Sequence, residues 1–352
     1  MHLSAMMDLD ALEQLIGIGM IDRKESDDGR VLYDYTHRAQ FSGMWTPETT
    51  QCRGLVTDTS GKVLARPFPK FWNLAEHASP NLPDIPDEPF EVLDKLDGSL
   101  IIVYRYQGRV CANTRGSFTS DQAIAALEWL LSPQSPAFDV RLDETWLFEW
   151  IAPDNRIVVN YGDRRECVLL DVIDNESGGS LLANRKHAFT VPEKIDAADL
   201  DALPERDNAE GYVVKFEGGM RVKVKHPRYV AIHRALSGLN EHRVWEMLRD
   251  GVPFDGLYEV LPDESYEWLK YTESLFRLRL VAHGLSATQE FGRVMGAAPL
   301  ATDNHRKAFA LEALKSPYRA ILFAMLDKKP YDHLIWKMIE PKGGEIGQTD
   351  SN

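Results

Sequence analysis

A change of residue pattern near residues 235–240 constrains this chain more than any other feature. Before it, short apolar or alternating runs typical of β-strands recur between turn residues. From residue 228 to 340 the sequence reads almost wholly as helices. We therefore expect the α+β class, with an antiparallel-strand domain at 1–237 and an all-helical domain at 238–342. The polar, glycine-containing tail at 343–352 is predicted to be disordered.

Charge limits the partners of the chain. The 352 residues carry a net charge of −14, which argues against a general nucleic-acid binder because affinity for phosphate comes from clustered Lys and Arg. Residues 215–228, however, hold five basic residues against Glu217, a local charge of +4. Such a strip inside an acidic protein can focus a polyanion into one groove. A solvated charged hairpin would look the same.

Several classes of protein find no support in the sequence. No apolar run approaches membrane-spanning length, and the N-terminus lacks the basic start of a secretory signal. Cys52, Cys111 and Cys167 are few and widely spaced, which favours a reducing cytoplasm over a disulfide framework or a zinc site. Ser-His-Asp, HExxH, CxxC and GxxxxGK[ST] patterns are not found in the sequence.

The stretch Lys95-Leu96-Asp97-Gly98-Ser99 is the strongest candidate for chemistry. It lies between the apolar runs 90–93 and 100–104, which we expect to be strands. A lysine at a turn between buried strands is unusual, and Asp-Gly permits a tight turn that leaves the amine accessible. A nucleophilic lysine could be presented to a phosphate in this way. An ordinary exposed hairpin lysine is the alternative.

Other charged residues surround this stretch along the chain, each on a predicted strand or turn. They are Arg53, Lys70, Arg115, Glu149, Glu210, Lys223 and Lys225. Phosphoryl transfer needs this mixture, because cations neutralise phosphates, carboxylates hold a metal or a ribose hydroxyl, and one nucleophile attacks in line. A nucleophilic Lys95 must be neutral, and we expect the neighbouring cations and a metal to lower its pKa.

Three of these features also allow plain structural explanations. Glu149, between Phe148 and Trp150, fits the exposed face of an alternating strand. Lys223 and Lys225 share one face of a strand and would also suit a sheet edge blunted by lysines. The Phe71-Trp72 pair fits the core as well as a base-stacking platform.

Taken in order, the motifs resemble the covalent nucleotidyltransferase superfamily of polynucleotide ligases and capping enzymes, and within it the phage-type RNA ligase 1 family. The resemblance covers about residues 30–235. It is carried by C-R-G at 52–54, R-P-F-P-K-F-W-N-L at 66–74, K-L-D-G-S at 95–99, T-R-G-S at 114–117, F-E-W-I-A-P-D-N-R-I-V-V-N-Y at 148–161, E-G-Y-V-V-K at 210–215 and K-V-K-H-P-R-Y at 223–229. The E-x-x-A-P-x-N-R-I run resembles RNA ligases more than DNA ligases.

The resemblance implies an ATP-dependent RNA ligase with three steps. Lys95 would attack the α-phosphate of ATP to form lysyl-AMP, the AMP would pass to an RNA 5′-phosphate, and a 3′-hydroxyl would displace it. Mg²⁺ or Mn²⁺ would assist. Partners would be RNA with such ends and an end-healing kinase or phosphatase, in the cytoplasm and without a membrane.

The same resemblance assigns roles to single residues. Arg53 and Lys70 would contact the ATP phosphates, Glu149 the ribose, and Lys223 with Lys225 the α-phosphate. Glu210 and Asp255 would bind the metal, although Glu210 could instead contact the nucleotide. Val213 would lie beside the adenine together with Phe71 or Trp72, and Tyr35 would belong to the nucleotide pocket. Tyr229 would take part in sealing. Arg115, also placed at the nucleotide, stands where the family usually has Lys, and its planar fork can contact phosphate differently.

Two other functions remain open at this point. A capping-type guanylyltransferase would share the motifs but carry a strand-rich module after them, whereas this chain continues in helices. A nucleotide- or RNA-binding protein without catalysis would be expected to have lost Lys95, Glu149 or the paired lysines. The helical domain is expected to select the RNA, although no recognition motif marks it.

Overall fold

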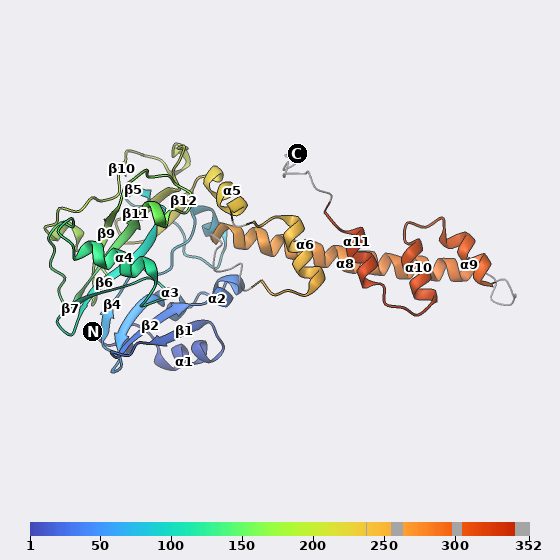
Figure 1. Cartoon of the computed structure of the whole chain (residues 1–352), viewed down its shortest axis with the longest axis horizontal. Coiled ribbons are helices and arrows are strands. Elements are labelled where there is room, and N and C mark those ends of the chain that lie inside the picture. The colour runs from blue at the N-terminus through green and yellow to red at the C-terminus, as the bar shows by residue number, and fades with distance from the viewer. Residues whose placement is uncertain (237, 255–262, 298–304, 342–352) are drawn as a thin grey trace. The chain divides into compact units, whose positions relative to one another are not determined.

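The computed structural model describes residues 1–236, 238–254, 263–297 and 305–341. It divides into two compact units, Met1–His233 and Arg234–Asn352, a division that lies a few residues before the expected domain boundary. The first unit contains antiparallel sheets and the second contains helices, so the α+β class is confirmed (Figure 1). The tail predicted at 343–352 lies outside the described residues.

The first sheet is an antiparallel meander near the N-terminus. Its strands, in order, are β1 (Ile21–Glu25), β2 (Arg30–Tyr35), β3 (Arg53–Asp58) and β4 (Val63–Ala65). Helix α1 (Leu9–Gly17), capped by Asp8, buries Leu12 and Leu15 against this sheet. Between β2 and β3 the chain forms α2 (His37–Ser42) and α3 (Pro47–Gln51), which begin at threonine caps that bond backbone N–H groups.

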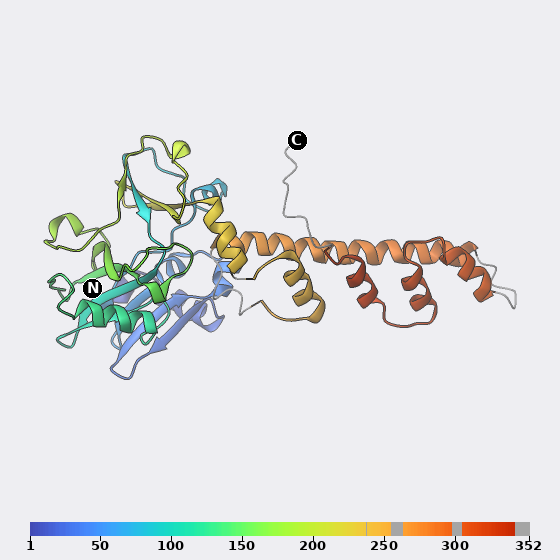
Figure 2. The ribbon, with the colours of Figure 1, turned by 45° about the horizontal axis from the view of Figure 1, so that its top comes forward.

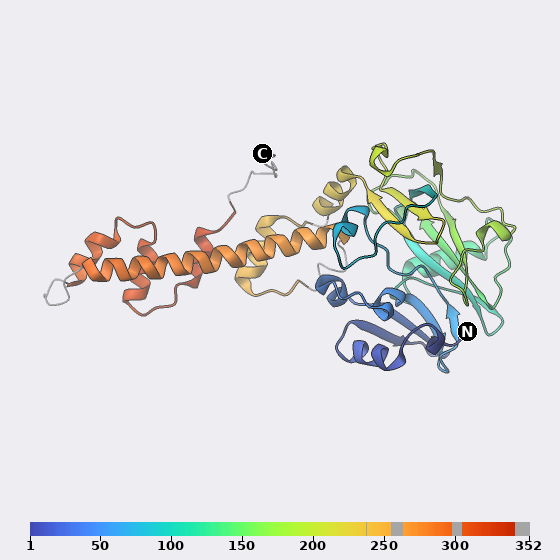
Figure 3. The ribbon, with the colours of Figure 1, turned by 180° about the vertical axis from the view of Figure 1, so that it is seen from behind.

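The second, central sheet has the order β7-β6-β8-β9. Its bounds are β6 (Ser99–Tyr106), β7 (Arg109–Asn113), β8 (Glu144–Ile151) and β9 (Glu166–Asp174). One face packs on α4 (Asp121–Leu130), where Ala126 and Leu130 meet Trp146, Phe148 and other buried side chains. The other face packs on the first sheet, drawn in blue in Figure 3, so these two sheets share a core.

The third sheet has the order β10-β5-β11-β12. Its bounds are β5 (Phe90–Lys95), β10 (Lys194–Ile195), β11 (Gly211–Phe216) and β12 (Arg221–Lys225). Val92, Tyr212, Val214 and Val222 form an apolar core on one face. Because side chains alternate along a strand, the opposite face carries the residues between them, including Lys95, Lys223 and Lys225.

The second unit is built along one long helix, α8 (Asp263–Ala297). Helices α6 (Glu241–Asp250), α9 (His305–Ala313), α10 (Arg319–Leu326) and α11 (Asp332–Met338) all contact it, as Figure 2 shows for this unit. Helix α5 (Pro227–Leu236) spans the division between the units. Among the described helices, none is at once long enough and apolar enough to cross a membrane.

The two strands on either side of the Lys95 stretch form as expected, but they do not pair with each other. Strand β5 pairs with β10 and β11, whereas β6 pairs with β7 and β8, so the chain passes from the third sheet to the central sheet between Lys95 and Ser99. The turn residue Gly98 is required by this crossing, since a Cβ there would lie 2.4 Å from the Trp150 carbonyl oxygen. Lys95 therefore lies where two sheets meet.

Candidate active site

Lys95 ends β5 and contacts a buried carboxylate. Its Nζ donates a hydrogen bond of 2.7 Å to Oε2 of Glu210, and Lys225 Nζ lies 3.1 Å from Oε1 of the same residue. The strand register explains this arrangement, because Gly211 pairs with Lys95 on one side and with Lys225 on the other. Gly211 has no room for a side chain, since a Cβ would lie 2.0 Å from the Val224 carbonyl oxygen, and its φ is +147°.

The pKa values of two carboxyl groups beside Lys95 are shifted in opposite directions. Burial raises the pKa of Glu149 to about 8, the attraction of Lys95 opposes this, and the Glu210 charge adds to it. Burial alone would also raise the pKa of Glu210, but Lys95 and Lys225 outweigh it and hold that pKa below its ordinary value. Glu149 Oε1 also accepts a 3.0 Å hydrogen bond from the Gly98 N–H. At neutral pH the site thus combines a protonated carboxyl with an ionised one.

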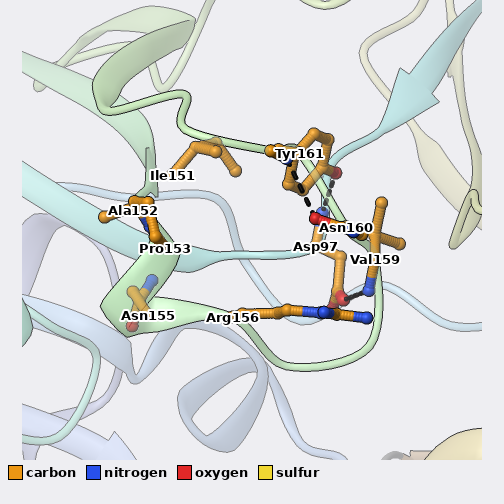
Figure 4. Close-up of a pocket in the computed structure, with 10 residues that line it drawn as sticks. Asp97, Ile151, Ala152, Pro153, Asn155, Arg156, Val159, Asn160 and Tyr161 are labelled. Carbon is orange, nitrogen blue, oxygen red and sulfur yellow. Dashed lines mark hydrogen bonds between the residues drawn. The ribbon is translucent and has the colours of Figure 1, made fainter.

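Asp97 connects the Lys95 stretch to two distant segments. Its Oδ2 accepts hydrogen bonds from the N–H groups of Val158 and Val159 at 2.8 and 2.7 Å, and its Oδ1 accepts one from the Tyr229 hydroxyl at 2.7 Å. Its own N–H donates to the Tyr161 hydroxyl (Figure 4). Asp97 and residues between 151 and 162 line a small cavity of about 10 Å³, which has room for roughly one water. Asp97 therefore fixes the position of the turn that follows Lys95.

The basic face of the third sheet continues toward the first sheet. Val213 pairs with Lys223 across β11 and β12, so both lie on the face that carries Lys95. The Phe71 ring lies between two cations, with Lys223 Nζ at 5.7 Å and the Arg53 guanidinium at 5.6 Å from its centre. Lys223 is buried, and its N–H donates to the Trp72 carbonyl. Phe71 therefore links Lys223 of the third sheet to Arg53 of the first sheet.

A second group of cations lies around Tyr35, the last residue of β2; Lys70 follows β4, and Arg115 follows β7 of the central sheet. The buried Lys70 ammonium lies 5.5 Å from the Tyr35 ring centre and 5.0 Å from that of Trp45, and it donates to Gln40 Oε1. Arg115 Nη1 donates a 2.7 Å hydrogen bond to the Tyr35 hydroxyl. Trp72 packs edge-on against Trp45, with ring centres 5.7 Å apart. Aromatic faces contact both cations, and Arg115 also pairs with Asp34, whose Oδ2 lies 3.1 Å from its Nε.

Nearly all of the predicted site residues converge. Within the first unit, contacts form two groups of these residues. The group around the Lys95 turn consists of Lys95, Glu149, Glu210, Lys225 and Tyr229. The other group consists of Tyr35, Arg53, Lys70, Trp72 and Arg115, and Val213 and Lys223 lie on the strands between the two. Asp255 lies outside the described residues. The roles of all these residues stay predictions.

The plain structural explanations fit less well. Lys95 is an ion-paired side chain with 21% exposure and not an exposed hairpin lysine. Glu149 is half-buried, in a strand whose other residues are buried on both faces. Strand β12 does lie at a sheet edge, but Lys223 is buried and Lys225 is ion-paired to Glu210. These lysines therefore do more than blunt an edge.

Four residues of the site were missed in the sequence. Asp34 and Trp45 lie outside the motifs, Tyr161 ends the 148–161 motif without an assigned role, and Asp97 was considered only for its part in the turn. Their importance comes from partners far away in the chain. One local signal existed for Asp34, because a carboxylate inside the alternating strand 31–36 is unusual unless it is paired.

The carboxylates suit a metal ion that is shared with a substrate. Among the described residues there is no group of three or more His, Cys, Asp or Glu that could hold a metal. Mg²⁺ often uses only one or two carboxylates and completes its shell with phosphate oxygens and waters. Glu210, the carboxylate that stays ionised, matches that pattern. Both Glu210 oxygens contact lysines in this structure, so a metal at Glu210 would share it with them.

Comparisons with known proteins identify the family of this chain. The family model described as RNA ligase matches residues 51–229, about half of the chain. A protein of Thermovibrio ammonificans, named as a candidate RNA ligase, is 30% identical over 246 residues, covering 64% of this chain and 63% of that protein. The RNA ligase of Rhodothermus phage RM378 is 21% identical and covers 63% and 68% of the two chains.

Two further comparisons differ in kind. A protein of Autographa californica nuclear polyhedrosis virus, named as a candidate bifunctional polynucleotide kinase/RNA ligase, is 26% identical over 53% of this chain and 31% of its own length. Among solved structures, a candidate ATP-dependent DNA ligase from Aquifex aeolicus aligns with a TM-score of 0.44 at 12% identity, covering 92% of this chain and 100% of that one. The chain spans less than two thirds of the Thermovibrio relative that it matches.

Proposed function

Since the chain belongs to the RNA ligase family, we propose that it is an ATP-dependent RNA ligase that joins 5′-phosphate and 3′-hydroxyl ends through lysyl-AMP and RNA-adenylate. The observation that carries the proposal is the position of Lys95. Lys95 lies where the chain passes from one sheet to another, and its amine donates a hydrogen bond to Glu210. The face of the third sheet that carries Lys95 also carries Lys223, which with Arg53 lies beside Phe71. A nucleophile beside phosphate-binding cations is what adenylyl transfer needs.

In the first step Lys95 Nζ attacks the α-phosphorus of ATP. A phosphorus–nitrogen bond forms, the bond to the bridging oxygen of the β-phosphate breaks, and pyrophosphate leaves with that electron pair. Lys95 must give up a proton to act as a nucleophile, and the carboxylate of Glu210 already accepts a hydrogen bond from it.

The other side chains divide the nucleotide between them. Lys225 and Lys223 hold the α-phosphate, and Arg53, Lys70 and Arg115 bind the outer phosphates. Glu149, protonated at neutral pH, donates a hydrogen bond to a ribose hydroxyl. Val213 and the aromatic side chains of Phe71 or Trp72 flank the adenine.

The second and third steps use the same centre. The RNA 5′-phosphate attacks the lysyl phosphorus and takes the AMP, which returns Lys95 to the free amine. The RNA 3′-hydroxyl then attacks the 5′-phosphate and releases AMP. The Tyr229 hydroxyl, bonded to Asp97 beside the turn, is the sealing residue. A Mg²⁺ or Mn²⁺ ion shared between a carboxylate and the phosphates would neutralise their charge.

RNA repair in the cytoplasm is the setting that we propose. Broken RNA often lacks the required ends, so an end-healing kinase or phosphatase would act first. The viral relative named as a kinase/RNA ligase supports this pairing. The three cysteines are free and buried, which suits a reducing compartment.

Covalent labelling with ATP tests the proposal. Purified protein with Mg²⁺ and α-labelled ATP should retain label on a denaturing gel and lose it when pyrophosphate is added. Lys95→Ala should remove the label while keeping the fold. Lys194→Ala is the matched control, since Lys194 forms an exposed pair with Glu91 in the same sheet.

The outcomes separate the candidates. Label on Lys95→Ala would remove Lys95 from the mechanism. Label with GTP but not with ATP would indicate a capping-type guanylyltransferase. No label with either nucleotide, in protein that mass spectrometry shows not to be already adenylated, would indicate a binding protein without catalysis.

A further inference from the structure

Arg115 stands where the RNA ligase family that this chain resembles usually has a lysine. Two consecutive residues of β2, Asp34 and Tyr35, contact its guanidinium. Nη1 donates to the Tyr35 hydroxyl at 2.7 Å, and Nε lies 3.1 Å from Asp34 Oδ2. The guanidinium carbon also lies 4.6 Å from the Tyr35 ring centre. Two atoms of one planar group thus reach two different acceptors.

Asp34 lies in an unusual environment. Its side chain is only 13% exposed, and its Oδ1 is buried with no hydrogen-bond partner among the described residues. The charges that face it come from Arg115, from Arg53 on β3, and from Asp22 and Lys24 on β1; burial, the dominant influence, raises its pKa to about 6 despite the two arginines. Burying a carboxylate lowers the stability of the fold unless ion pairs and hydrogen bonds with its partners compensate.

The backbone of Arg115 is also fixed. A Cβ on Gly54 would lie 3.1 Å from the Arg115 Cα and 2.5 Å from Ile102 Cδ1, so Gly54 allows the strand that carries Arg53 to touch the Arg115 loop. Lys24 Nζ donates to the Gly116 carbonyl at 2.8 Å. With its backbone held, the direction of the Arg115 side chain depends on Tyr35 and Asp34.

We propose that Asp34 is a positioning residue that holds the Arg115 guanidinium toward the nucleotide phosphates, and that it makes this chain dependent on arginine at position 115. A lysine ammonium presents all its donors from one nitrogen and cannot reproduce the two separate contacts of the fork. This inference rests on the proposed function. It assigns to Asp34 a role that none of the motifs contains.

A double-mutant cycle tests the inference. We would measure single-turnover formation of lysyl-AMP, as kcat/KM for ATP, in the wild type, Asp34→Asn, Arg115→Lys and the double variant. Each single change should lower kcat/KM about tenfold, and the double variant should be about as slow as either single variant, because both break one interaction. Additive losses, or an unchanged rate in Asp34→Asn, would overturn the inference.

Asp28→Asn is the matched control. Asp28 is a half-buried carboxylate in the turn between β1 and β2, and it also pairs with arginines, Arg30 and Arg109. Its loss should lower the melting temperature and leave kcat/KM within about twofold of the wild type. If Asp34→Asn does not fold, Asp34→Glu, which keeps the charge but moves the carboxylate by one carbon, takes its place in the same cycle with Arg115→Lys.

The pH profile separates positioning from a structural role. Below pH 6 Asp34 gains a proton and loses the charge that attracts Arg115. The ratio of wild-type to Asp34→Asn rates should therefore fall from about ten at pH 7.5 toward one near pH 5, and the ratio cancels titrations that both proteins share. A ratio that does not change with pH would contradict the positioning role.

Binding of tripolyphosphate, measured by calorimetry, keeps the test independent of catalysis. Asp34→Asn and Arg115→Lys should weaken it to a similar extent, and Asp28→Asn should not. A wild type that binds tripolyphosphate in this way but forms no lysyl-AMP would refute the proposed function and leave the inference standing. Equal binding by all variants would refute the inference alone.

Discussion

At the scale of single residues, Glu149 makes stability depend on pH. Its pKa is about 8 in the folded chain, above the ordinary value of 4.5, because burial disfavours the charged form. Between these values the unfolded chain has released the proton and the folded chain keeps it, so the stability contributed below pH 4.5 is lost as pH rises toward 8. Glu149→Gln should remove this loss and be more stable than the wild type near pH 8, by a few kcal/mol on the order expected for such a shift.

Denaturant unfolding from pH 5 to 8.5 would measure this difference. Glu91→Gln is the control, because the hydrogen bond from Lys194 lowers the pKa of Glu91 and its titration is complete below this range. Curves for the wild type and Glu149→Gln that run parallel across the range would show that Glu149 does not titrate as stated.

The sequence predicted single residues where a motif marked them. Lys95, Glu149, Glu210 and Lys225 were singled out, and the structure connects them by direct contacts. Asp34 and Asp97 could not be assigned in this way, because their importance comes from hydrogen bonds to segments such as 114–117 and 158–159, and no local pattern encodes those distances.

At the scale of elements, Asp171 joins two sheets. It lies on β9 of the central sheet, is buried, and pairs with Arg221 at 2.7 Å and Lys215 at 3.6 Å on β12 and β11 of the third sheet. Asp171→Asn should lower the free energy of unfolding by about 3 kcal/mol, because it leaves two cations without their carboxylate in an enclosed place.

Urea unfolding of Asp171→Asn would check this value. Asp154→Asn breaks the exposed pair with Arg165 and should change stability by less than about 0.5 kcal/mol. A loss in Asp171→Asn no larger than in this control would show that the two sheets do not depend on the ion pair.

Elements were predicted well where their residues alternate or repeat. The strands at 31–36, 53–58 and 145–151 appear within a residue or two of their expected bounds. Strand β1 was missed because only Ile21 of its five residues is buried, and the other four resemble a loop. Helix α8 was expected at 264–282 but extends to Ala297, since its later turns pack apolar residues such as Ala287 and Val294 on other helices.

At the scale of the whole molecule, the two units separate the expected tasks. All the described residues that contact Lys95, Glu149 and Glu210 belong to Met1–His233, and the helical unit begins after them. A chain ending after Gly238 should still form lysyl-AMP, at a rate within about tenfold of the full chain, but should lose selectivity among RNA ends.

Labelling with ATP and ligation of different RNA ends, measured on both proteins, would check this division. The melting temperature of the shortened chain is the control for folding. Loss of lysyl-AMP formation in a folded shortened chain would show that the helical unit, which includes Asp255, takes part in the first step.

The hydrogen bonds around Lys95 also have a consequence for the order in which the protein can become active. Lys95 bonds Glu210, 115 residues later, and Asp97 bonds Tyr229, 132 residues later. A ribosome makes the lysine long before it makes either partner, and such distant contacts form late in folding. A nascent or prematurely terminated chain that ends before residue 210 therefore carries Lys95 without its carboxylate partner, and we expect the proposed activity to arise only when the first unit is nearly complete.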